Sequence, residues 1–236
     1  MGFWSGVGSF ISGAISGVCG VIGSLASTLG AGLTSLAMSL ASLGTALLPI
    51  AGAIAIVAQV LGIFGKEDSV GDLGYQMENC HDKKPEDFDS TQAYIEHVRA
   101  NVAKPSAEDK SNWSEEDKLK YTALGASVTL KAIEENKGFN LSPESWTTLC
   151  AHLGQVEGTD KQAKVLEKVV DNFKGADMDK LTQYLGGKLE STSDRILVSD
   201  KLNDMYQALN PDMSAREVYQ EVEKFEKPVD VGKTNG

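Results

Sequence analysis

The chain has 236 residues and a formal net charge of −11, because 33 Asp and Glu residues outnumber 22 Lys and Arg residues. Nucleic-acid binding requires a basic surface, so this charge balance predicts no nucleic-acid partner. The length allows one or two domains. Three widely spaced cysteines are inconsistent with a disulfide framework.

The first 65 residues contain no Lys, Arg, Asp, Glu or His. A globular domain usually carries about one charged residue in four, and about 20 apolar residues are enough to cross a bilayer. The secretory pattern of a basic segment before a short apolar run is missing, and no basic flank sets an orientation before Lys66. We expect a protein made in the cytoplasm without a standard signal peptide, in which 1–65 is a membrane-active or buried helical region.

Small residues recur every four positions in the first part of this neutral block. Residues four apart share one face of a helix, and faces of small residues let helices approach closely in membranes. The spacing therefore predicts helix packing or membrane contact through two rows, made of Ser9, Gly13 and Gly17, and of Ser16, Gly20, Ser24, Thr28 and Gly32.

A leucine pattern with a period of 3.5 residues follows, which is typical of a helix-pairing seam. Pro49 then interrupts the helical pattern. The block is therefore predicted to form two or three helical segments, near 5–29, 31–48 and 50–64, arranged as a hydrophobic hairpin with bends at 30–32 and at Pro49. The seam consists of Leu29, Leu33, Leu36, Leu40, Leu43 and Leu47.

Beyond the block, the sequence predicts a linker at 66–89, an acidic all-α domain at 90–227 and a polar tail at 228–236. Capping residues such as Ser114, Ser142 and Ser214 precede helical patterns. These signals divide the acidic domain into a bundle of six or seven short helices. Their predicted ranges are 91–103, 115–135, 143–153, 160–174, 178–186, 194–209 and 215–226.

Residues with catalytic or ligating chemistry are sparse. Cys80-His81 and Cys150-x-His152 could supply four metal ligands, but their separation of 70 positions does not match the usual zinc spacings. His97 lies on a predicted helix with no nucleophile nearby in sequence. The chain also carries none of the common nucleotide-binding or hydrolase motifs. We therefore expect no metal, no cofactor and no catalytic residue, and a protein that is not an enzyme.

An uncharged Gly/Ser/Ala-rich N-terminus joined to a polar helical domain resembles the glycine-zipper membrane proteins, a class that includes pore-forming secretion effectors. It also resembles the hydrophobic ejection or tail-lumen proteins of phages. The first resemblance implies a delivered, non-enzymatic protein that inserts into a lipid bilayer, self-associates through its small-residue faces and forms a pore. A carrier, chaperone or immunity protein would then bind the acidic domain. The second implies a structural component of a virion or injection machine, with the block buried in protein.

Overall fold

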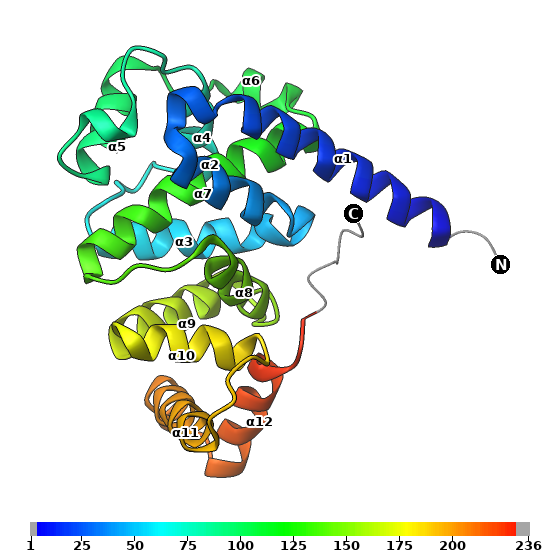
Figure 1. Ribbon diagram of the computed structural model, residues 1–236, viewed down its shortest axis with the longest axis vertical. Helices are drawn as coiled ribbons and strands as arrows, with labels where there is room; N and C mark the ends of the chain where they lie inside the picture. The colour runs from blue at the N-terminus through cyan, green and yellow to red at the C-terminus, as the bar shows by residue number, and fades with distance from the viewer. Residues whose placement is uncertain (1–3, 230–236) are drawn as a thin grey trace.

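The computed structural model describes the backbone of residues 4–229 and the side chains of residues 13–229. This part of the chain is all-helical and contains no strand, which confirms the predicted fold class (Figure 1). Its elements are α1 (Trp4–Ser24), α2 (Ala26–Ala41), η1 (Gly44–Ala46), α3 (Leu47–Val60), α4 (Val70–Glu78), η2 (Pro85–Asp87), α5 (Thr91–Asn101), α6 (Ala107–Asn112), α7 (Glu115–Lys137), α8 (Pro143–Leu153), α9 (Thr159–Asn172), α10 (Ala176–Leu185), α11 (Thr192–Leu209) and α12 (Ala215–Glu226).

The neutral block bends close to the predicted positions. Gly30 breaks the helical geometry inside α2 with a φ of 76°, a conformation that glycine adopts without steric cost. The second bend comes before Pro49 rather than at it, between α2 and α3. Pro49 lies in the first turn of α3, where its missing N–H has no helical partner to lose. A further break at Leu25 separates α1 from α2.

Serine caps define most helices of the charged half. The side chains of Ser114, Ser142 and Ser214 each accept a hydrogen bond from the third residue of the following helix, as predicted. The segment predicted as a linker contains a helix, α4, because Ser69 caps it and Val70, Leu73 and Met77 form an apolar buried side. Helix α6 was also not predicted. Of the predicted tail, residues 230–236 lie outside the described part of the chain.

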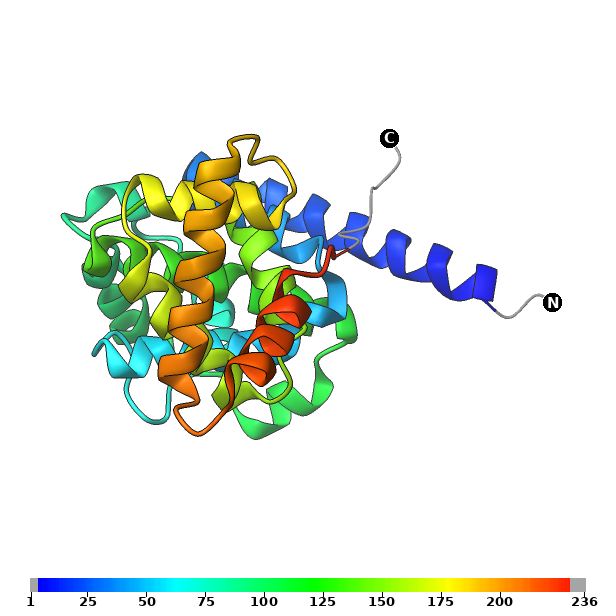
Figure 2. The ribbon, with the colours of Figure 1, turned by 90° about the horizontal axis from the view of Figure 1, so that it is seen from below.

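The two compositional halves share one hydrophobic core. Helix α2 packs on α7 and α8, while α3 packs on α9 and α7. Helices α10, α11 and α12 lie further from the neutral block and cover the outer side of α8 and α9 (Figures 1 and 2). Packing is therefore continuous across the change of composition at residue 65, since apolar side chains from both sides of it belong to one cluster.

Helices α4 and α7 approach each other closely, and two glycines permit this approach. A Cβ placed on Gly74 would overlap the carbonyl oxygen of Tyr121, and a Cβ placed on Gly125 would overlap that of Val70. Close packing through small residues was predicted within the neutral block. In the described structure its tightest example instead lies between two helices of the charged half.

Candidate functional site

The neutral block is the candidate functional region, and its leucine seam points into the protein. Leu36, Leu40 and Leu47 are fully buried, and Leu29 is 2 % exposed. Leu33 and Leu43 are half-buried at the edge of the same cluster. The predicted seam therefore exists as a buried face, and α2 packs against α7, α1 and α8 of the same chain.

At every described position except Thr28, the small-residue rows are exposed. On α1, the exposed members are Gly13, Ser16, Gly17, Gly20 and Ser24, and Cβ atoms built on these three glycines would have no atom within 4 Å. Gly32 on α2 is also exposed and equally free of neighbours, whereas Thr28 is half-buried and donates to the carbonyl oxygen of Leu25. The side chain of Ser9 lies outside the described residues.

The opposite face of α1 attaches this helix to the body. Val18 is 3 % exposed and Ile22 is fully buried. The thiol of Cys19 donates to the carbonyl oxygen of Met38 at 3.7 Å, which joins α1 to α2. From residue 13 onward, α1 thus has one apolar face on the protein and one exposed, uncharged face of mostly small residues.

Polar contacts between the block and the rest of the chain are few. The hydroxyl groups of Ser39 on α2 and Thr147 on α8 lie 2.8 Å apart and share a hydrogen bond. On α3, Gly52 faces Thr159, and a Cβ at Gly52 would come within 2.8 Å of the Thr159 methyl carbon. The block is therefore held mainly by apolar packing, which is not directional.

A cation from α5 binds the C-terminal end of the block. The Arg99 guanidinium donates to the carbonyl oxygen of Ile63 at 3.1 Å and lies 4.7 Å from the centre of the Phe64 ring. It also pairs with Asp68 at 3.1 Å, and Lys104 pairs with the same carboxylate at 2.8 Å.

Burial alone raises the pKa of Asp68, but this effect is outweighed by the hydrogen bond from Lys104, the backbone N–H of Gly65 and the charge of Arg99. These lower the pKa of Asp68 below its usual value, so the carboxylate stays ionised between its two cations. Sequence reasoning missed this anchor because Arg99 is 36 positions from Ile63 and nothing in its local pattern indicates the contact.

In the described part of the block, length and composition identify one candidate for crossing a bilayer, which is a bent pair of helices. Among the described residues, no single helix is both long and apolar enough to cross a membrane. The pair formed by Ala26–Ala41 and Gly44–Val60 meets both criteria when taken together, although its two parts are bent by 104°.

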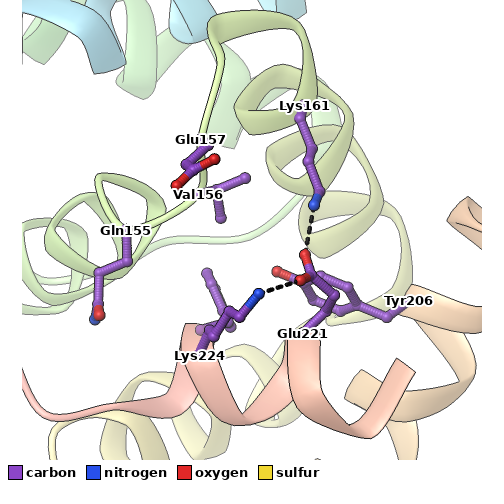
Figure 3. A pocket seen from close by; sticks show the side chains of 8 residues that line it. Gln155, Val156, Glu157, Lys161, Tyr206, Glu221 and Lys224 are labelled. Atoms are coloured by element: carbon purple, nitrogen blue, oxygen red, sulfur yellow. Dashed lines mark hydrogen bonds and ion pairs between the residues drawn. The ribbon is translucent and has the colours of Figure 1, made fainter. Parts of the chain in front are cut away.

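A polar pocket between α9 and α12 is a second place where side chains converge (Figure 3). Lys161 and Lys224 both pair with Glu221, at 2.5 and 2.6 Å, and their hydrogen bonds lower the pKa of Glu221. The hydroxyl of Tyr206 is buried beside them and has no hydrogen-bond partner among the described residues. The pocket has a volume of about 160 Å³, and the Lys161–Glu221 ion pair at its edge links α9 to α12.

The two cysteine–histidine pairs considered from the sequence do not form one site. Cys150 is fully buried in α8, and the Nδ1–H group of His152 donates to the carbonyl oxygen of Phe225 at 2.5 Å. Cys80 lies after α4, where its thiol donates to Asp82 at 3.2 Å. The catalytic and cofactor expectations remain predictions.

Comparisons with models of known protein families, with curated protein sequences and with solved structures found no match.

Proposed function

We propose that this chain is a non-enzymatic membrane-inserting protein, and that the described fold is its state before insertion, in which helices of the charged half cover the neutral block. The observation that carries the proposal is the position of α2 and α3. These helices carry no charged residue, yet they lie within the fold, between α7 on one side and α8 and α9 on the other. In this arrangement the helices of the charged half cover an apolar helix pair that resembles a broken membrane span.

The energetics of release support this proposal. Moving a leucine from a protein core into lipid tails keeps it away from water, so the hydrophobic effect favours the two locations about equally. The balance then depends on packing and on the few polar contacts of the block. Two of these are the Ser39–Thr147 hydrogen bond and the Arg99 contact with Ile63.

The exposed face of α1 gives the proposal its second part. In an isolated helix in water, each glycine costs up to ~1 kcal/mol relative to alanine, so a glycine-rich exposed face must offer some other benefit. We propose that this face associates with further copies of the chain after insertion, because small residues let helix backbones approach closely in lipid. A pore or a permeabilised membrane follows from that association.

The test is release of a fluorescent dye from lipid vesicles by the purified full-length chain. Gly17→Leu and Gly20→Leu add bulk where a Cβ meets nothing within 4 Å, so both variants should fold normally but release dye at least tenfold more slowly. Ser27→Leu places a leucine at an exposed position of α2 outside the two rows and should retain activity. No dye release by the unaltered chain would contradict the proposal.

A second function is favoured by one observation, which is that the buried side of α2 and α3 packs against other helices of the protein. The chain would then be a structural or ejected component of a virion or injection machine, and the free face of α1 would pack against protein. A fixed copy number in purified particles, together with no effect on vesicles, would support this alternative and refute pore formation.

A further inference from the structure

The segment between α4 and α5 brings a thiol, a carboxylate and an imidazole together. Cys80 and Asp82 lie on the loop after α4, and His97 lies on α5. The Cys80 thiol donates to one Asp82 oxygen at 3.2 Å, and Nε2 of His97 lies 2.9 Å from the other oxygen. One ligand atom from each of the three residues lies within 4.8 Å of the other two.

The surroundings of this cluster contain a buried polar group that no described residue satisfies. Tyr94 is 1 % exposed, and its hydroxyl has no hydrogen-bond partner among the described residues. Tyr94 and His97 both pack against the ring of Phe88, with distances between ring centres of 5.6 and 5.0 Å. A buried hydroxyl without a hydrogen-bond partner is unfavourable, so a bound water or ligand in this region would stabilise the fold.

We propose that Cys80, Asp82 and His97 bind a divalent transition-metal ion, with zinc as the best match. A thiolate, a carboxylate and a neutral imidazole are all accepted zinc ligands, and three protein ligands with one open position are typical of exchangeable or catalytic zinc sites. The thiolate and carboxylate would neutralise both charges of the ion. Calcium and magnesium prefer oxygen ligands alone, so this ligand set disfavours them.

Binding requires a defined rearrangement of protons. Cys80 releases its thiol proton to solvent, and the neutral His97 ring carries its proton on Nδ1 so that Nε2 can bind the ion. The amide nitrogen of Asn101 lies 3.2 Å from Nδ1 and donates to the carbonyl oxygen of His97 at 2.8 Å. Because this nitrogen is a donor, the Asn101 side chain must move away from a protonated Nδ1 when the ion binds.

This site is separate from the two cysteine–histidine pairs considered in the sequence, since it shares only Cys80 with them. Asp82 and His97 were not predicted as ligands, because His97 follows Asp82 by 15 positions and lies on the next helix. The spacing Cys80-x-Asp82, followed by a histidine on the next helix, was the signal available.

The experiment adds Co²⁺, and then Zn²⁺ in competition, to the metal-free, reduced full-length chain. We expect one equivalent of Co²⁺ to produce a thiolate-to-cobalt charge-transfer band, Zn²⁺ to abolish it, and Zn²⁺ to raise the melting temperature, because an ion that binds only the folded state stabilises it. Cys80→Ser should remove the band. Asp82→Asn, at a side chain that is 55 % exposed, should leave the fold intact and weaken Zn²⁺ binding at least tenfold.

Two controls separate this site from adventitious binding. His81→Ala removes a neighbouring exposed imidazole, and Cys19→Ser removes a thiol of α1, so both should bind Zn²⁺ like the unaltered chain. Absence of the cobalt band in the unaltered chain would overturn the proposal. An equally strong band in a folded Cys80→Ser protein, as judged by circular dichroism, would also overturn it.

Discussion

The crossing of α4 and α7 gives the sharpest prediction about stability. Replacing Gly74 by Ala would place a Cβ 2.7 Å from the carbonyl carbon of Tyr121 and 2.9 Å from the amide nitrogen of Gly125, and closer still to the Tyr121 oxygen. All three are backbone atoms, so no side chain can rotate away. Since carbon atoms prefer separations of about 3.5–4.0 Å, the helices must move apart by on the order of 1 Å.

Overpacking of this kind costs about 3 kcal/mol at the upper end of its usual range, and the higher helix propensity of alanine returns up to ~1 kcal/mol. We therefore expect Gly74→Ala to lower the free energy of unfolding by about 2 kcal/mol. In a chain of this size, that change corresponds to a drop in melting temperature of roughly 4–8 °C.

Gly71→Ala is the matched control in the same helix. Its Cβ would meet only a ring carbon of Trp113, at an ordinary 3.7 Å, so the propensity gain should make this variant equal to or more stable than the unaltered chain. Urea unfolding followed by circular dichroism measures both variants. Equal stability of Gly74→Ala and Gly71→Ala would refute the close approach of the two helices.

Two further predictions concern the anchor of the neutral block and the response to acid. Arg99→Ala removes a partly buried donor to Ile63 together with a cation–π contact. It should destabilise the fold by about 2 kcal/mol in urea unfolding, whereas a loss below about 0.5 kcal/mol would show that Arg99 does not anchor the block. Burial lowers the pKa of His152 below 6.5. Below that pH the unfolded chain takes up a proton that the folded chain excludes. The free energy of unfolding should therefore decrease as the pH is lowered, by up to about 1.4 kcal/mol per pH unit. His152→Gln should flatten this slope between pH 7.5 and 5.5, and an unchanged slope would assign the effect to other groups.

Local sequence signals predicted the helices well, because capping and apolar periodicity act within one or two turns of the chain. Ser114, Ser142 and Ser214 each begin a helix as expected. The short helix α4 was missed because Gly71 and Gly74 are typical of loops. Gly74 is instead required by a partner helix about fifty residues away, which no local pattern reveals.

The candidate site was predicted only in part for the same reason. The period of the leucines identified a buried face, but the sequence could not show that its neighbours are α7 and α8 of the same chain. Likewise, the glycine spacing on α1 identified a face of small residues without indicating that it would be exposed. Arg99 is the clearest example of a contact that local sequence does not reveal. It lies on α5, far from the block in sequence, but in the fold it places a positive charge at the C-terminal end of the block.

The central claim is that the neutral block separates from the helices of the charged half to enter a membrane. A reversible disulfide bond between the two parts tests this claim most directly. The hydroxyl oxygens of Ser39 and Thr147 are 2.8 Å apart, so the double variant Ser39→Cys/Thr147→Cys places two thiols close enough for a disulfide between α2 and α8. Mass spectrometry verifies the bond, and each single cysteine variant is a control.

We predict that the oxidised double variant binds vesicles without releasing their dye, and that a reducing agent restores release to the level of the single variants. Equal dye release by the oxidised and reduced forms would contradict the claim, because it would show that α2 need not separate from α8 for the protein to act on a membrane.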